Sequence, residues 1–401
     1  MKRFITALLS LSLLFGCTLS RLPQTHRFTV CAKKNSEASQ PSLTLSAPSA
    51  LLMEAETGTI LYEQKAHTAR PPASVTKIMT LDLIFDAIEK KQISLTDNVT
   101  VSENASSMGG SQVFLETGEV QTVETLIKCI SIASANDACV AMAEHICGSE
   151  EEFVAQMNQK AADLGMKDTH FVNCCGLSAN GHVTSAYDIA LMARDLTTRH
   201  PQIHDYCTIW MENIIHNTKR GATEFGLANT NKLLKQYPYA TGLKTGYTAT
   251  AKYCLAATAE KDGTKLIAVL MAAPDIKSRS ADAQTLLNYG FSVCRVYQDK
   301  TPPKLPSLPV KKGEKDSVAL AYESRMSYVS TSGEDLSGIK RKIKLPKSAD
   351  APVKKGAAAG KIIYYLGDKK LGHVNILYAE SIRHAAFTDY FLSLLQKLFF
   401  L

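Results

Sequence analysis

The fold is restricted most by strand-like sequence at both ends of the first 300 residues, with helical sequence between them. The expected strands are residues 50–55, 59–62, 243–248, 253–260 and 265–273. Glu56-Thr57-Gly58 and Lys261-Asp262-Gly263 lie between neighbouring strands and are typical of hairpin turns. We therefore expect one antiparallel sheet, assembled from distant segments and flanked by helices, which is an α/β fold of the α+β type.

The segments between these strands show apolar residues at helical spacing. The expected helices are 70–91, 122–146 with a break at Ala133–Asn136, 149–164, 184–196 and 282–294. Ser149 and Glu152 form a capping box at the start of the third. The helical segments are numerous enough to cover both faces of a sheet.

The helix at 70–91 carries a candidate nucleophile. Pro71 and Pro72 end the preceding segment, and Ser74 and Lys77 then lie three residues apart, on one face of the first turn. A serine hydroxyl needs a base within hydrogen-bond reach, and a lysine amine can serve when it is neutral. The N–H groups of the helix N-terminus suit an oxyanion.

Two further motifs supply groups that such a site needs. Ser134 and Asn136 lie two residues apart in the break between helical segments, where a hydroxyl can relay a proton and an amide can hold an amine or a carbonyl. Lys244-Thr245-Gly246 opens a strand and offers a cation, a hydroxyl donor and room for a substrate backbone. Taken singly, each motif also occurs as an ordinary turn or strand start.

In this order, the three motifs are the signature of penicillin-binding serine acyltransferases. The segments ASVTKIMT, SANDA and GLKTGYTATAKYCLAA resemble the low-molecular-mass D-alanyl-D-alanine carboxypeptidases, which are serine peptidases of family S11. FVNCCGLSANGHVTSAYDIA resembles the same family, and the likeness is dense from residue 46 to about residue 295. The resemblance implies a β-lactamase/transpeptidase-like catalytic domain.

The resemblance also implies roles for the residues of the first two motifs. Ser74 would form the acyl-enzyme, with Lys77 as its base. Ser134 would pass protons, and Asn136 would orient Lys77 and the substrate. The nearby charge of Lys244 and partial burial would keep the Lys77 amine neutral.

The third motif would bind the substrate. By the same resemblance, Lys244 and Thr245 would hold the terminal carboxylate of a peptide ending in D-Ala-D-Ala, beside Gly246. The backbone N–H groups of Ser74 and Tyr247 would form the oxyanion hole. β-Lactams, which mimic this peptide, would acylate Ser74. No cofactor is implied.

Three alternatives remain at this stage. A class A β-lactamase would need a glutamate for deacylation, and the span Asp168–Ala186 contains none. A D,D-endopeptidase or transpeptidase of the same fold is not separated by these motifs. A non-catalytic envelope lipoprotein that binds wall peptides is disfavoured by the complete motif set.

The N-terminus has the features of an export signal, covering residues 1–17. Lys2 and Arg3 precede an apolar run that is too short for a stable membrane span. The sequence Leu14-Phe15-Gly16-Cys17 resembles a lipoprotein processing site, and ordinary signal cleavage nearby is the alternative. We expect the protein to be exported to the periplasmic face of the cytoplasmic membrane.

The remaining domain boundaries follow from composition. We expect a flexible spacer at 18–45, the catalytic domain at 46–298 and a small β-rich domain at 304–383. Residues 384–401 have an apolar face typical of an amphipathic helix in a membrane interface, and packing on protein is the alternative.

The net charge of +7 is unevenly distributed along the chain. Residues 301–401 contain 17 Lys/Arg and 9 Asp/Glu and so carry +8, whereas the first 300 residues carry −1. This distribution argues against a nucleic-acid enzyme and favours contact with an anionic surface.

The ten cysteines of an exported chain suggest disulfides. Their spacing includes no C-x-x-C pair and no Cys/His cluster, so we expect no metal site.

Overall fold

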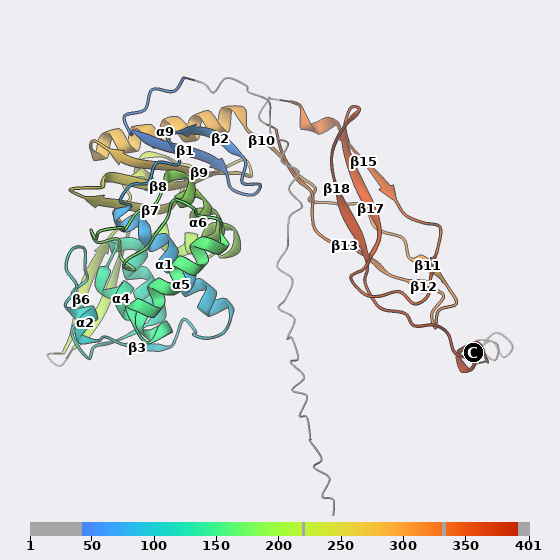
Figure 1. Ribbon diagram of the computed structural model, residues 1–401, viewed down its shortest axis with the longest axis horizontal. Coiled ribbons are helices and arrows are strands. Elements are labelled where there is room, and N and C mark those ends of the chain that lie inside the picture. The colour runs from blue at the N-terminus through green and yellow to red at the C-terminus, as the bar shows by residue number, and fades with distance from the viewer. Residues whose placement is uncertain (1–41, 219–220, 331–333, 392–401) are drawn as a thin grey trace, which may run out of the picture.

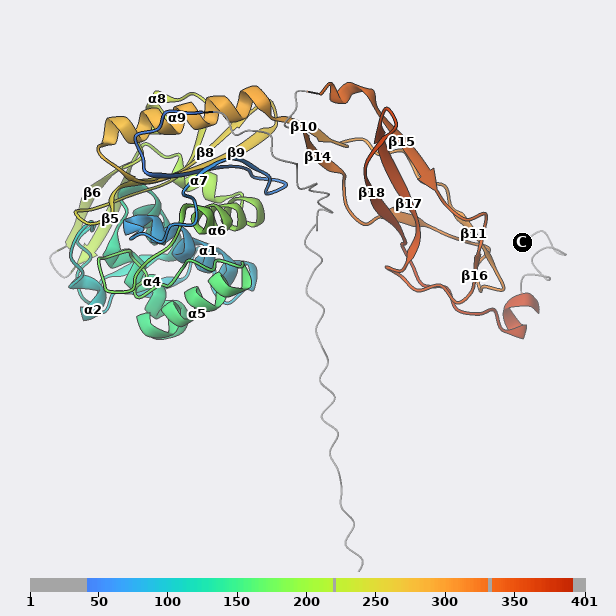
Figure 2. The ribbon, with the colours of Figure 1, turned by 45° about the horizontal axis from the view of Figure 1, so that its top comes forward.

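The computed structural model describes residues 42–218, 221–330 and 334–391 (Figure 1). It combines helices with antiparallel sheets, as expected from the sequence. Figures 1 and 2 show a sheet covered by helices in blue to yellow and a separate β-rich part in orange to red. The expected signal peptide with Cys17, most of the spacer and most of the terminal helix lie outside the described residues.

The main sheet has five strands in the order β2-β1-β9-β8-β7, all antiparallel. Its strands are β1 (Ser49–Glu54), β2 (Ile60–Gln64), β7 (Ala240–Thr248), β8 (Lys252–Lys261) and β9 (Thr264–Ala273). Both predicted hairpins are present, as β1–β2 and β8–β9. The pairing of Leu51 with Val269 joins the two distant sets of strands, which confirms a single sheet.

The two faces of this sheet contribute to different cores because side chains alternate along a strand. Leu51 and Met53 belong to the larger core with Ile78 of helix α1 (Lys77–Glu89). Leu52 points the other way and packs in the smaller core with Leu286. That residue comes from α9 (Ile276–Val293), which covers this face together with the short helix α8 (Leu233–Gln236), whose Leu233 belongs to the same core (Figure 2).

The remaining helices of this part lie mainly on the other face (Figure 1). They are α2 (Glu103–Ser106), α3 (Val123–Lys128), α4 (Asn136–Cys147), α5 (Glu150–Asp163), α6 (Ala186–Arg199) and α7 (Ile203–Cys207). Two short ladders accompany them, β3 (Asn98–Thr100) with β4 (Val120–Thr122) and β5 (Met211–Thr218) with β6 (Gly221–Ala228). The Oγ of Ser149 accepts the Glu152 backbone N–H, so the predicted cap of α5 is present.

Two helix boundaries differ from the sequence expectation. Ser74 lies in a separate 3-10 turn, η1 (Ala73–Thr76), directly before α1. Helix α9 begins six residues before the expected residue 282, because the carboxylate of Asp275 accepts the backbone N–H of Ser278 and caps an earlier start.

Buried ion pairs connect helices α1, α5 and α6. The Nζ of Lys160 in α5 lies 2.8 Å from carboxylate oxygens of Asp82 and Asp86 in α1. It lies 2.9 Å from Asp195 of α6. Arg199 of α6 also contacts Asp86 and Asp195. The orientation of α1, which begins beside Ser74, is therefore set by charge as well as by apolar packing.

The C-terminal part is built almost entirely of strands, as predicted. They are β11 (Leu308–Lys311), β12 (Ser317–Val318), β13 (Leu320–Tyr322), β14 (Ser327–Ser330), β15 (Ile339–Lys344), β16 (Ala349–Asp350), β17 (Ala358–Leu366) and β18 (Lys369–Tyr378). The largest sheet has the order β13-β18-β17-β15.

A short ladder connects the two parts. Strand β10 (Arg295–Gln298) follows α9 and pairs with β14. Val296 packs against the smaller core of the helical part, and the next residue, Tyr297, packs against the core of the C-terminal sheet.

The expectation of disulfides is wrong for the cysteines that the structure describes. All eight are free, and seven of them are buried. A buried cysteine packs as a small apolar side chain; Cys17 and Cys31 lie outside the described residues. Within the described ranges, no helix is long and apolar enough to cross a membrane.

Candidate active site

The side chain of Lys77 lies at the centre of the candidate site and is fully buried. Its Nζ is 3.0 Å from the Ser74 Oγ, 2.6 Å from the Asn136 Oδ1 and 2.7 Å from the backbone oxygen of Cys175. The structure therefore brings the first two sequence motifs together, as predicted, and adds a backbone carbonyl as a third partner.

These contacts determine how the lysine presents its proton-accepting position. The oxygens of Asn136 and Cys175 can only accept, so each takes one N–H of Lys77. The remaining direction at Nζ faces the Ser74 hydroxyl. In a neutral amine that direction holds the lone pair, and Lys77 is then placed to take the hydroxyl proton.

Asn136 is held in place on both sides of its amide. Its Nδ2 donates to the Gly109 carbonyl at 2.6 Å, and its backbone N–H donates to the Ser111 carbonyl at 2.7 Å. The next residue, Asp137, accepts the backbone N–H of Val113 and fixes the same loop. Because Nδ2 is engaged as a donor, Oδ1 is the atom that faces Lys77.

Ser134 lies in the predicted break between helical segments. A π-helical turn, η2 (Cys129–Ala133), ends at Ser134, which has a left-handed backbone with φ of 64°. Its Oγ is buried and has no hydrogen-bond partner among the described residues. An unengaged hydroxyl in a buried position is available to a substrate group.

The Lys-Thr-Gly motif lies on β7, against the backbone of the nucleophile. A Cβ on Gly246 would lie 2.8 Å from the Pro72 carbonyl oxygen and 3.1 Å from the Ser74 nitrogen. The strand can approach so closely only because residue 246 has no side chain. Thr245 shares a hydrogen bond of 2.8 Å with the Thr230 hydroxyl, and Tyr247 is exposed.

Lys244 of the same motif is almost fully buried. Burial, with a further contribution from the charge of Lys77, lowers the pKa of Lys244 to about 7. Arg279 of α9 is a third nearby cation and also lowers this pKa. Its guanidinium donates to the Cys254 carbonyl of β8 at 3.2 Å. Sequence reasoning missed Arg279 because no motif surrounds it.

The loop that supplies the Cys175 carbonyl was also missed as part of the site. The Asn173 Oδ1 accepts the backbone N–H groups of Cys175, Gly176 and Leu177 and so folds the loop. The Cys174 carbonyl accepts the hydroxyl of Thr80 in α1. These are backbone contacts, and side-chain motifs carry no signal for them.

Gly176 allows this loop to lie directly on the nucleophile's turn. A Cβ at this position would overlap the carbonyl oxygen of Ala73, and its φ of +86° also favours glycine. The loop, η1 and β7 are therefore packed backbone against backbone around Ser74.

His182 has a structural role. Its Nδ1 accepts the Val172 backbone N–H, so its Nε2 donates to the Thr76 hydroxyl at 2.8 Å. Burial lowers the pKa of His182 to about 4, which keeps the ring neutral.

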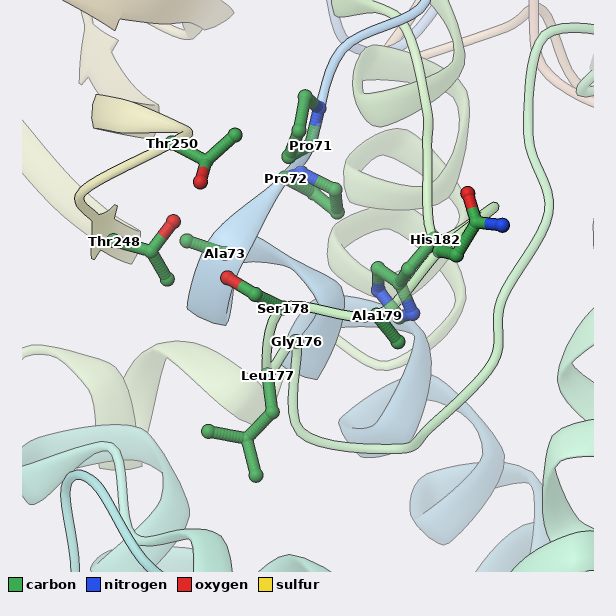
Figure 3. A pocket seen from close by; sticks show the side chains of 11 residues that line it. Pro71, Pro72, Ala73, Gly176, Leu177, Ser178, Ala179, His182, Thr248 and Thr250 are labelled. Carbon is green, nitrogen blue, oxygen red and sulfur yellow. The ribbon is translucent and has the colours of Figure 1, made fainter.

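A cavity of about 280 Å³ opens beside Ala73, the residue that precedes Ser74 (Figure 3). It lies between the turn Pro71–Ala73, the loop segment 176–182, Thr248 at the end of β7 and Thr250 in the turn that follows. Figure 3 shows Thr248 and Thr250 on the side of the cavity opposite His182. Its lining residues carry no Asp, Glu, Lys or Arg, so it suits an uncharged portion of a ligand.

Two groups of side chains could in principle hold a metal among the described residues. Asp82, Asp86 and His200 form one group, and the Lys160 ammonium already contacts both of its carboxylates. Glu150, Cys174 and Cys175 form the other, which touches the site through the Cys175 backbone. Neither group includes Ser74 or Lys77.

This fold and site define a serine enzyme of the acyl-transferring, penicillin-binding class. Residues 34–275 match the D-alanyl-D-alanine carboxypeptidase family, Peptidase_S11, and residues 291–384 match the C-terminal domain of penicillin-binding protein 5. The chain belongs to the D-alanyl-D-alanine carboxypeptidase family of serine peptidases.

Individual relatives agree with this assignment over most of their length. The chain is 41% identical to the D-alanyl-D-alanine carboxypeptidase DacF of Bacillus subtilis, covering 86% of this chain and 88% of that protein. It is 33% identical to DacD of Escherichia coli, covering 86% and 90%.

Solved structures give the same result for the fold. Penicillin-binding protein 5 of Haemophilus influenzae superposes with a TM-score of 0.69 at 28% identity, covering 86% of this chain and 99% of that one. For penicillin-binding protein 6B of Escherichia coli the TM-score is 0.66 at 30% identity, covering 88% and 99%.

Proposed function

We propose that this protein removes the terminal D-alanine from peptidoglycan stem peptides through an acyl-enzyme on Ser74. The observation that carries the proposal is the position of the Lys77 Nζ, 3.0 Å from the Ser74 Oγ, with two of its other directions taken by carbonyl oxygens. Membership of the D-alanyl-D-alanine carboxypeptidase family supplies the substrate class. The catalytic domain would span residues 46–298.

In the acylation step, Lys77 takes the Ser74 hydroxyl proton while Oγ bonds to the carbonyl carbon of the penultimate D-alanine. The backbone N–H groups of Ser74 and Tyr247 stabilise the oxyanion. The C–N bond then breaks, and the departing D-alanine amine receives a proton through the Ser134 hydroxyl, which is otherwise unengaged. Asn136 keeps Lys77 in position throughout.

Lys244 and Thr245 bind the terminal carboxylate, beside the open backbone at Gly246. A buried ammonium group provides a strong electrostatic partner for a carboxylate entering a site of low dielectric constant. In the second step, water attacks the carbonyl carbon of the acyl ester, the bond from that carbon to the Ser74 Oγ breaks, and a proton from the water passes to Oγ. The shortened stem peptide leaves with the water oxygen in its new carboxylate. β-Lactams, with an amide and a carboxylate in equivalent places, acylate the same serine.

The contacts of Lys77 count against a class A β-lactamase. In the span 168–186, the atom in contact with Lys77 is the carbonyl oxygen of Cys175, which cannot take a proton from water. Asp168 is the one acidic residue of that span, and it is not among the contacts of Ser74 or Lys77 in the described part of the chain. A D,D-endopeptidase or transpeptidase acting through the same groups is the second candidate, and the complete catalytic set disfavours a non-catalytic lipoprotein.

The test is release of D-alanine from a peptide ending in Lys-D-Ala-D-Ala by the purified protein, with Ser74→Ala beside it. We expect release by the wild type, none by the variant, and labelling of the wild type alone by a fluorescent penicillin. Absence of both release and labelling in a folded wild type would contradict the enzyme assignment. A cross-linked dimeric peptide in the same assay separates carboxypeptidase from endopeptidase activity.

The envelope location is part of the same proposal. We place the catalytic domain outside the cytoplasmic membrane, on its periplasmic face, after export by the signal at 1–17. The terminal helix, and Cys17 if it is lipidated, would attach the protein to the membrane surface. Phe387, Tyr390 and Phe391 are 83%, 55% and 51% exposed, which suits insertion into an interface.

A further inference from the structure

One face of the C-terminal sheet is covered by lysines. Figures 1 and 2 show β15, β17 and β18 side by side. These three strands contain 6, 9 and 10 residues. They include seven Lys/Arg and no Asp or Glu. The position of each lysine on the sheet decides whether these charges act together.

The strand register places five of the lysines on a single face. Lys340 is opposite Tyr365, which is opposite Lys370, and Lys344 is opposite Lys361. Residues opposite each other in a ladder share a face, as do residues two apart along a strand. The lysine face therefore consists of Lys340, Lys342, Lys344, Lys361 and Lys370.

The lysine face is not neutralised within the protein. All five side chains are exposed, and none has an ion pair or a side-chain hydrogen bond among the described residues. By contrast, Arg341 on the opposite face pairs with Asp299, and Lys369 pairs with Glu334. Neighbouring cations are therefore paired with acidic side chains, whereas the five lysines of the lysine face are not paired among the described residues.

Protection of an open sheet edge accounts for only part of this pattern. Lysines commonly block unwanted pairing at edge strands, and β15 is an edge of the sheet. Lys361, however, is on β17 and is paired with Lys344 of β15 on one side and Asn375 of β18 on the other. Among the described residues, strand β13 pairs with β18 only at Ile376–Tyr378, so Lys370 borders an open stretch of that strand. The charge extends across three strands, as a docking surface for a polyanion requires.

We propose that the lysine face binds the acidic stem peptides of the same polymer that the active site trims. This rests on the proposed function, in which each uncut stem peptide ends in a free carboxylate. A chain carrying many such carboxylates is a linear polyanion. Lys340 to Lys344 extend over about 13 Å of strand, enough for more than one carboxylate. Contact at a second site raises the effective concentration of stem peptides near Ser74.

The test measures binding of the full chain to purified uncross-linked peptidoglycan with intact pentapeptides. All proteins carry Ser74→Ala, so the polymer is not consumed. We compare Lys340→Gln/Lys342→Gln/Lys344→Gln with a matched control, Lys90→Gln/Lys91→Gln/Lys167→Gln, which removes three exposed lysines of the catalytic domain. We expect roughly ten-fold weaker binding for the first variant, no change for the control, and weakening of wild-type binding by salt.

A second variant, Lys361→Gln, separates polymer binding from edge protection because Lys361 lies between two paired strands, and it is also expected to weaken binding. In proteins with Ser74 intact, the lysine-face variants should raise KM for the polymer and leave kcat/KM for a soluble pentapeptide unchanged. Equal binding by wild type and both variants would overturn the proposal, as would loss of binding to phosphatidylglycerol vesicles with polymer binding retained. Because binding is measured without catalysis, failure of the proposed activity would show separately, as no D-alanine release from the soluble pentapeptide.

Discussion

Ser74 is surrounded by backbone that comes unusually close to it on two sides. Gly246 of β7 faces the Pro72 carbonyl and the Ser74 nitrogen, and Gly176 faces the Ala73 carbonyl. A side chain at either position would displace a segment that carries a functional atom. The positions of the Ser74 N–H and the Cys175 carbonyl thus depend on two residues that take no part in the chemistry.

Gly176→Ala tests this dependence, with Gly181→Ala as the control. Both glycines have positive φ, +86° and +81°, so both substitutions carry a similar backbone cost of about 1 kcal/mol. At Gly181 the nearest atom is 3.9 Å from the new Cβ, whereas at Gly176 the Cβ overlaps the Ala73 carbonyl. We expect penicillin acylation to fall at least about ten-fold in Gly176→Ala alone. Equal acylation rates in the two variants would contradict the close-packing argument.

Lys244 provides a second prediction at this scale, for stability against pH. Its pKa is about 7 in the folded protein and returns to the ordinary lysine value on unfolding. Between pH 7 and about 10 the unfolded chain therefore holds one proton more, and stability rises with pH by up to about 1.4 kcal/mol per unit. Below pH 7 the full cost of burying the charge is present.

Lys244→Met removes that cost, so we expect the variant to be more stable than the wild type at pH 6 and the difference to shrink toward pH 10. Urea unfolding of both proteins at three pH values measures it. Parallel pH profiles would show that Lys244 does not titrate as described. The same variant should bind the peptide carboxylate poorly, since the stabilising change removes the cation that the substrate needs.

Residue-level prediction succeeded where side chains form spaced motifs. Ser74, Lys77 and Asn136 were expected together, and the structure brings them into contact. It failed where the partner is a backbone atom, as at the Cys175 carbonyl, or a lone side chain brought in by the fold, as with Arg279. Such atoms have no local sequence signal because their place depends on tertiary packing.

At the scale of elements, α1 must keep its orientation because it carries both Ser74's turn and Lys77. The buried ammonium of Lys160 contacts Asp82, Asp86 and Asp195 and so joins α1 to α5 and α6. Burial raises the pKa of Asp82 well above its ordinary value, and the nearby charge of Lys160 opposes that rise.

Lys160→Met should therefore be strongly destabilising, by about 3–5 kcal/mol, because it leaves carboxylates buried without their cation. Lys315→Met, which breaks the exposed pair with Glu380, serves as the control and should leave the urea midpoint unchanged. If Lys160→Met unfolds at the wild-type midpoint, the ion cluster does not hold α1.

Elements were predictable from the period of apolar residues and from turn chemistry. Both hairpins, the strands of the main sheet and the break before Ser134 were found in this way. The start of α9 was misplaced because Asp275 caps a first turn that is polar and therefore shows no apolar period. The order of the strands required the long-range pairing of β1 with β9, which no local pattern reveals.

At the scale of the whole molecule, attachment to a membrane can be tested at the two chain ends. Deleting residues 386–401 should move the protein to the soluble fraction if the terminal helix is the anchor, because the exposed Phe387, Tyr390 and Phe391 are then lost. Cys17→Ser is the matched variant for lipidation, and fractionation of cells measures both. A deletion variant that stays membrane-bound, together with release of Cys17→Ser, would remove the helix from this role.

The ladder between β10 and β14 has a consequence for how far the enzyme reaches. Consecutive residues of β10 pack into different cores, Val296 into one part and Tyr297 into the other. The two parts are therefore joined through a shared strand, and this ladder sets the distance between Ser74 and the C-terminal sheet. In a protein attached to the membrane through its C-terminal part, we expect this distance to restrict cleavage to stem peptides at one distance from the membrane surface.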